Sequence, residues 1–111
     1  MLLARARMAR PLLLVLDEPC AGMDPGVRER FLAWLQTQLQ KPDTPTVVLV
    51  THHIEEIIPG LGTTLVLCNG RVHSAGATQQ VVTREMIEAV YKTRLERLER
   101  SGDRLWPIWA T

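Results

Sequence analysis

Two short apolar runs, "LLLVL" at residues 12–16 and "TVVLVT" at residues 46–51, decide which folds are open to this chain. Neither run alternates with polar residues, and the second is rich in β-branched side chains. Both features are typical of strands that are buried on both faces of a parallel sheet. Parallel strands need a crossover connection, which is usually a helix. The sequence therefore predicts an α/β core in which these two runs are neighbouring strands.

The segment between the two runs has the features of an amphipathic helix. Asp24 can cap this helix and Pro25 fits its first turn. The sequence "KPDTP" at residues 41–45 ends it. Apolar side chains recur at helical spacing, and this stripe predicts core packing by Val27, Phe31, Trp34, Leu35 and Leu39.

Shorter elements are predicted on either side of this core. Residues 1–10 favour a helix that Pro11 stops, and "HHIEEII" favours a short helix ending near Pro59. "NG" at residues 69–70 is the strongest short-range signal for a β-hairpin turn. Residues 77–91 favour a helix in two pieces.

Two structures are open for the C-terminal tail. The leucines of "RLERLER" have helical spacing, which would continue a helix to Arg100. Alternatively, "SGD" at residues 101–103 forms the turn of a second hairpin, because two tryptophans, Leu105 and Ile108 follow it. We favour the hairpin, with a solvated charged face.

Composition limits the class of protein. A chain of 111 residues with 46% apolar content fits one small domain. Its net charge of +1 gives no reason to expect nucleic acid as a partner. No run approaches the roughly 20 apolar residues that span a bilayer, and no convincing targeting segment is present. Cys20 and Cys68 lack metal-binding spacing, so we expect small core residues in a reducing, cytoplasmic compartment.

Polar side chains follow both predicted strands. Asp17 and Glu18 come directly after the first, and Thr51, His52 and His53 end or follow the second. Ligands of open parallel sheets bind beyond the carboxyl ends of the strands, so these groups should converge. Two adjacent carboxylates repel each other unless a cation lies between them or one is protonated. Asp17 could therefore hold Mg²⁺ while Glu18 activates a water and a histidine contacts a phosphate or orients that water.

The same residues carry a resemblance to a family. "LLLVLDEP" resembles the Walker B segment of ATP-binding cassette (ABC) ATPases, "AGMD" is similar to their D-loop, and "VTHHIEEI" resembles their switch-histidine segment. "VLCNGRVHSAGATQQVV" is similar to the strand-turn-strand segment that follows. An acidic pair alone would be an ordinary strand end, but these segments occur in the family's order and spacing over residues 1–92.

The resemblance implies a fold and two parts of the chain. The fold is α/β: a partial P-loop NTPase-type parallel sheet with flanking helices and C-terminal antiparallel hairpins. Residues 1–92 would be the C-terminal half of an ABC nucleotide-binding domain, and residues 93–111 a tail outside the shared motifs.

The resemblance also implies roles for individual residues. Asp17 would be the metal-associated carboxylate, and Glu18 the catalytic carboxylate that polarises the attacking water. His52 would be the catalytic switch histidine near the γ-phosphate. Asp24 would lie in the loop that touches the opposing subunit. The implied cofactors are ATP and Mg²⁺. His53 and Cys20 depart from the usual family residues without touching the catalytic positions.

Several parts of the family's site are absent from the sequence. No glycine begins the pattern G-x-x-x-x-G-K-[ST], and the glutamine loop and the L-S-G-G-Q signature are missing. We therefore expect the isolated chain to be inactive as an ATPase. The N-terminal half of the domain is the implied partner. It would belong either to a truncated reading frame or to a separate chain that docks on the sheet edge.

The implied function is that of an ATP-binding and ATP-hydrolysing subunit of an ABC transporter. Its further partners would be a second ABC ATPase subunit and membrane-spanning transporter subunits, which place it in the cytoplasm at the inner face of the membrane. A soluble non-transport ABC ATPase and a non-catalytic interaction module are the alternatives. The transported substrate and the direction of transport are not encoded in these residues.

Overall fold

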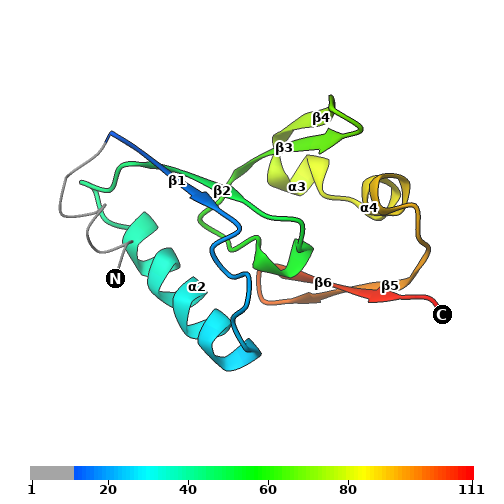
Figure 1. The fold of residues 1–111 in the computed structure, drawn as a ribbon, viewed down its shortest axis with the longest axis horizontal. Helices are drawn as coiled ribbons and strands as arrows, with labels where there is room; N and C mark the ends of the chain where they lie inside the picture. Colours follow the sequence, from blue (N-terminus) through cyan, green and yellow to red (C-terminus); the bar gives the residue numbers. More distant parts are fainter. Residues whose placement is uncertain (1–11) are drawn as a thin grey trace. The chain divides into compact units, whose positions relative to one another are not determined.

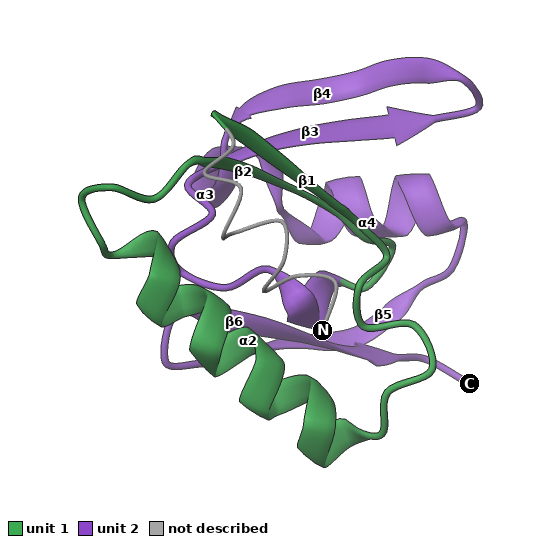
Figure 2. Cartoon of the chain, turned by 60° about the vertical axis from the view of Figure 1, so that its left-hand side comes forward, with its two compact units in different colours: residues 1–53 green, residues 54–111 purple. Residues whose placement is uncertain are grey.

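The computed structural model describes residues 12–111, so the helix predicted for residues 1–10 lies outside the described residues. The chain divides into two compact units (Figure 2). Unit 1 extends to His53, and unit 2 begins at Ile54.

Unit 1 is a strand-helix-strand element. It contains β1 (Leu13–Asp17), α2 (Pro25–Leu39) and β2 (Thr46–Val50) (Figure 1). β1 and β2 pair in parallel, in a register that sets Asp17 beside Val50. The predicted parallel α/β core is therefore confirmed, with α2 as the crossover connection that parallel strands need.

Helix α2 begins and packs largely as its sequence requires. Asp24 is the N-cap, and its Oδ1 accepts a hydrogen bond of 2.8 Å from the backbone N–H of Val27. The buried residues of the helix are Leu32 and Leu35. The predicted stripe included Leu35 but missed Leu32. Val27 is exposed because it lies in the first turn, so the packed face begins one turn later.

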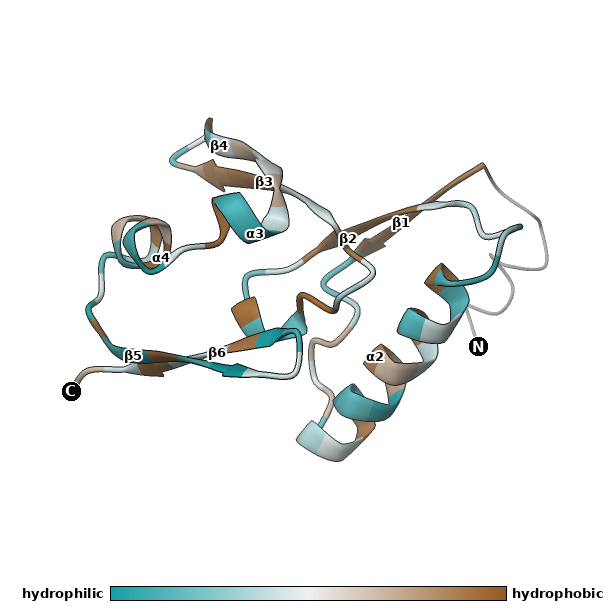
Figure 3. Cartoon of the chain, turned by 180° about the vertical axis from the view of Figure 1, so that it is seen from behind, coloured by the Kyte–Doolittle hydropathy of each residue, from teal (hydrophilic) through white to brown (hydrophobic). Residues whose placement is uncertain are grey.

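The two strands of unit 1 have one covered face and one open face. Leu14, Leu16, Val47 and Leu49 are buried or half-buried, whereas Leu13, Val15, Val48 and Val50 are 43–55% exposed. We call these four exposed residues the open face; both strands are hydrophobic along their length in Figure 3. The expected burial of both faces is wrong for the described residues, because α2 covers only one side.

Unit 2 is built from two hairpins and three short helical segments. In chain order these are η1 (Ile54–Glu56), β3 (Thr63–Cys68), β4 (Arg71–Ala77), α3 (Thr78–Val81), α4 (Arg84–Tyr91), β5 (Leu95–Ser101) and β6 (Arg104–Trp109). Both strand pairs are antiparallel. Asn69 and Gly70 form the first turn with φ of 54° and 72°, the left-handed geometry that an Asn-Gly turn provides.

Two further expectations concern the length and type of elements. The short helix after β2 is a single 3₁₀ turn, and both His52 and His53 precede it. The hairpin favoured for the tail is confirmed by β5 and β6, whose turn is formed by Gly102 and Asp103. Left-handed geometry at Gly102, with φ of 61°, closes this turn.

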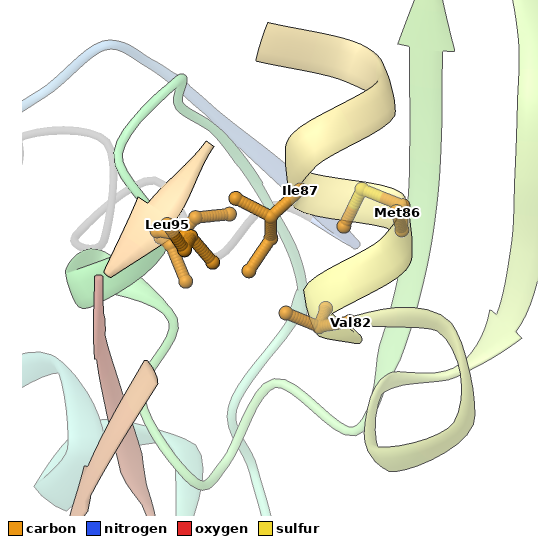
Figure 4. Close-up of a cluster of buried hydrophobic side chains, with 5 residues drawn as sticks. Val82, Met86, Ile87 and Leu95 are labelled. Carbon is orange, nitrogen blue, oxygen red and sulfur yellow. The ribbon is translucent and has the colours of Figure 1, made fainter. Parts of the chain in front are cut away.

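The core of unit 2 includes the tail. Five buried side chains form it, from η1, the α3–α4 junction, α4 and β5: Ile54, Val82, Met86, Ile87 and Leu95 (Figure 4). Leu98 and Leu105 of the hairpin pack against this cluster. Neither cysteine forms a disulfide; Cys20 of unit 1 is buried and Cys68 is half-buried. Among residues 12–111, no helix is long and apolar enough to cross a bilayer.

Candidate functional site

The carboxyl ends of β1 and β2 lie at the same edge of the sheet. Asp17 is the last residue of β1 and stands beside Val50, the last residue of β2. The ladder continues one residue further, because the N–H of Glu18 donates a 2.8 Å hydrogen bond to the carbonyl of Val50. Residues that follow either strand are consequently held close together, at the edge where open parallel sheets bind ligands.

Glu18 and His52 meet at this edge. Their atoms Oε1 and Nδ1 are 2.6 Å apart, and the side chains are 32% and 68% exposed, respectively. With an ionised carboxylate, which only accepts hydrogen bonds, Nδ1 of His52 is the donor of this contact. The contact therefore fixes one ring nitrogen of His52 beside the carboxylate of Glu18.

The backbone of Glu18 is in a left-handed conformation. Its φ is 49°, a value that non-glycine residues adopt at an energetic cost. The turn that follows is held by hydrogen bonds from Ala21 N to Glu18 O (3.1 Å) and from Met23 N to Cys20 O (3.0 Å), and by burial of Cys20. Strained residues of this kind cluster at functional sites, where the surrounding structure holds them.

The histidine loop is short and locally ordered. The backbone N–H of His53 donates to Oγ1 of Thr51 at 3.0 Å, and the rings of His52 and His53 lie 4.1 Å apart. Glu18 is the partner that the structure gives to the His52 ring across the sheet edge. The arrangement places an imidazole directly beside a carboxylate. Together these two side chains can position a water molecule next to a phosphate.

Asp17 offers an exposed carboxylate at the same edge. Within residues 12–111, no three His, Cys, Asp or Glu side chains gather into a metal cage. Mg²⁺ does not need one, because it is commonly bound by one or two carboxylates together with phosphate oxygens and waters. The donor chemistry at the strand end therefore fits Mg²⁺ held jointly with a nucleotide.

Asp24 has a partner in its own helix. Its carboxylate accepts from Val27 as the cap of α2. The structure thus brings Glu18 and His52 together and places Asp17 at the end of β1. Asp24 is the N-cap of α2. The catalytic, metal and interface roles of the four residues stay predictions.

Sequence reasoning assigned no role to Glu56, which the structure buries to 3% exposure. The residue was visible as the final Glu of "VTHHIEE", where the switch-histidine pattern T-H-D-x-x-E also ends. Charged side chains are rarely buried without partners. The buried carboxylate of Glu56 therefore indicates that the segment around it is fixed in place. Unit 2 also contains a cavity of about 320 Å³, and none of the predicted site residues lines it.

Comparison with known proteins places these features in a wider context. Over 97 residues, the chain is 38% identical to the ABC transporter ATP-binding protein YlmA of Bacillus subtilis, covering 87% of this chain and 37% of YlmA. Over 71 residues, it is 38% identical to the energy-coupling factor transporter ATP-binding protein EcfA2 of Acetivibrio thermocellus, covering 64% of this chain and 25% of that protein. No family model matches the chain.

A solved structure has the same fold. It is an inward-facing metal-chelate type ABC transporter, with a TM-score of 0.77 and 22% identity over 97% of this chain and 43% of the other. The chain spans about a third of the length of curated relatives that it matches.

Proposed function

The chain belongs to the ABC ATPases, and we propose that it corresponds to the C-terminal part of their nucleotide-binding domain and is part of an ATP-hydrolysing subunit of an ABC transporter. In this proposal the chain supplies the catalytic carboxylate and the switch histidine. The observation that carries the proposal is the 2.6 Å contact of Glu18 with His52 at the common end of two parallel strands.

The chemistry follows from the position of each side chain. Glu18 accepts a hydrogen bond from the attacking water and so orients the oxygen toward the γ-phosphate. The Nδ1 contact with Glu18 holds the His52 ring beside that carboxylate, where the histidine would contact the γ-phosphate. Asp17 would hold Mg²⁺, which neutralises phosphate charge when it is bound. Positioning supplies most of the catalysis in phosphoryl transfer, and these residues provide only part of it.

We propose that the N-terminal half of the domain supplies the remaining part. The four phosphate charges of ATP lack the glycine-rich loop and lysine that would hold them, so the isolated chain should be inactive as an ATPase. The open face of Leu13, Val15, Val48 and Val50 is an apolar surface for the N-terminal half of the domain to cover. That half is the partner we propose first.

Further partners follow from the transporter assignment. A second ABC ATPase subunit would face the loop that ends at Asp24, and membrane-spanning subunits would couple hydrolysis to transport. The protein would then lie in the cytoplasm, at the inner face of the membrane. Relatives named as transporter ATP-binding proteins support this assignment over the two alternatives, a soluble ABC ATPase and a non-catalytic interaction module.

Nucleotide binding tests the proposal. The part of YlmA that precedes the matched segment is fused in front of this chain, and Mg-ATP binding is measured by calorimetry for the fusion and for the chain alone. We expect binding by the fusion, little by the chain, and loss of Mg²⁺-dependent binding in Asp17→Asn. Asp103→Asn removes the same charge at the tip of the β5–β6 hairpin and should leave binding unchanged.

Two results would count against the proposal. One is a folded fusion, judged by circular dichroism, that binds no nucleotide, which favours a non-catalytic interaction module. The other is equal Mg²⁺-dependent binding by the fusion and by its Asp17→Asn variant, which would remove Asp17 from the metal site.

A further inference from the structure

Unit 2 contains a cavity that the proposed nucleotide site does not use. Its volume of about 320 Å³ lies at the lower end of the range for small-molecule sites, which is roughly 300–1,000 Å³. The residues that line it all lie between Ile54 and Leu105 in the sequence. The walls of the cavity therefore come from unit 2 alone.

Most of the lining residues are apolar. Ile54 and Val82 belong to the buried cluster of unit 2, and Leu105 packs against that cluster. Ile57 and Ile58 also line the cavity, and Ile58 is only 3% exposed. Burying a polar group without a hydrogen bond is costly, so a ligand of this cavity must have an apolar part.

The wall beside β3 is held by hydrogen bonds within the protein. Leu61 and Gly62 precede β3, and Thr78 begins α3. Oγ1 of Thr78 donates to the carbonyl of Leu61 at 2.8 Å, and its backbone N–H donates to the carbonyl of Gly62 at 2.9 Å. This wall needs no ligand to form, which lowers the cost of ordering when a ligand binds.

The hairpin of β5 and β6 contributes another wall, through Arg100, Asp103 and Leu105. Arg104, the first residue of β6, attaches this hairpin to η1. Its Nε donates to the backbone carbonyl of Glu55 at 3.0 Å, and its Nη2 donates to the same oxygen. The wall that carries the two charged lining residues is therefore also fixed by contacts within unit 2.

Arg100 and Asp103 place opposite charges at this cavity, three residues apart at one hairpin turn. Arg100 stands opposite Leu105 in the register of the hairpin, so both belong to one face of it. Among residues 12–111, neither Arg100 nor Asp103 has an ion-pair partner. A guanidinium can bind a carboxylate through two parallel N–H donors, and a carboxylate can accept from an ammonium.

We propose that this cavity binds a small aliphatic amino acid, such as leucine, as a zwitterion. The ligand's carboxylate pairs with Arg100, its ammonium pairs with Asp103, and its side chain packs on the apolar lining. An amino acid carries both charged groups and the side chain on the same carbon, which suits two opposite charges beside one apolar cavity. A nucleotide does not suit it, because several negative charges would meet one arginine with an aspartate nearby.

Nuclear magnetic resonance of the full chain, with ¹³C-labelled isoleucine methyl groups, tests the proposal without nucleotide. L-leucine is added to millimolar concentration. We expect saturating shifts of the Ile57 and Ile58 methyl groups, which line the cavity, and none at Ile108, which does not. Isocaproate lacks the ammonium and L-leucinamide lacks the carboxylate. Each should bind about tenfold more weakly, the effect of losing a hydrogen bond to a charged group.

Variants of the two charged residues identify the contacts. Arg100→Met should weaken binding of L-leucine by about tenfold or more. Arg97→Met is the matched control, because Arg97 also lies in β5 but pairs with Glu99, and its affinity should be unchanged. Asp103→Asn should weaken binding of L-leucine but not of isocaproate, since only L-leucine has the ammonium. If Arg100→Met fails to fold, Arg100→Lys decides, because it keeps the charge without the planar fork and should bind L-leucine more weakly.

Three results would overturn the proposal. One is the absence of shifts at Ile57 and Ile58 with L-leucine, L-isoleucine and L-valine. Another is binding of isocaproate and L-leucinamide as tight as that of L-leucine, which would mean an apolar cavity without recognition of charge. The third is equal affinity of Arg100→Met and Arg97→Met for L-leucine. None of these measurements involves ATP, so failure of this inference is distinct from failure of the proposed function.

Discussion

The left-handed backbone of Glu18 predicts which of two substitutions at this position, glycine or alanine, gives the more stable protein. At φ of 49°, an L-residue is disfavoured by roughly 1–2 kcal/mol, whereas glycine adopts this region freely. Glycine in turn loses more entropy on folding, by roughly 0.5–1 kcal/mol relative to alanine. Glu18→Gly should therefore be more stable than Glu18→Ala by about 0.75 kcal/mol, which is the difference between the midpoints of these two ranges.

Comparing the two variants cancels the loss of the carboxylate, because both remove the contact with His52. Position 29 is the matched control, since Glu29 lies inside α2 and also carries a surface ion pair, with Arg28. There Gly should be less stable than Ala by about 1 kcal/mol. The assay is urea unfolding followed by tryptophan fluorescence and circular dichroism. If glycine is the less stable residue at position 18 as well, Glu18 does not hold the strained conformation on which the site geometry rests.

Three further substitutions test individual elements of the two units. Leu95→Ala should lower the free energy of unfolding by about 2–5 kcal/mol in a urea titration, because it leaves a cavity in the core that includes Ile54; a loss below 1 kcal/mol would contradict that packing. Asp24→Ala should cost about 1 kcal/mol in the same assay, and Asp24→Asn should restore most of it, because Asn is also a good N-cap. Equal stability of these two variants would mean that capping is unimportant. Gly70→Ala should lower the thermal unfolding midpoint, because its φ is 72°, and the effect should exceed that of Ala at Gly62, where φ is not left-handed.

Sequence reasoning succeeded where local pattern and strand-end geometry carry the information. The two apolar runs could pair in parallel only through a helix, and their register then brought Glu18 and His52 to one edge. The hairpin at Asn69 and Gly70 was equally local, since the turn residues themselves require left-handed backbone. Motif spacing and strand topology therefore predict the same site, the shared edge at the ends of β1 and β2.

Other features depend on contacts that are distant in the sequence. The open face exists because one side of β1 and β2 is left uncovered by the described residues. The apolar pattern of the strands alone does not show which of their faces is covered. The bond from Arg104 to Glu55 joins residues 49 positions apart, and a charged tail read as solvated gave no sign of it. The left-handed Glu18 was also invisible, because a glutamate is not a residue that predicts positive φ.

Single-turnover hydrolysis of Mg-ATP by the YlmA fusion tests the central claim most directly. The claim is that Glu18 orients the attacking water at the shared end of β1 and β2. Glu18→Gln should reduce the rate by about 10²–10⁴-fold, the contribution typical of a general base, while nucleotide binding persists. Glu29→Gln, which removes the same charge from α2, should leave the rate unchanged. Hydrolysis by Glu18→Gln at the rate of the unsubstituted fusion would contradict the account.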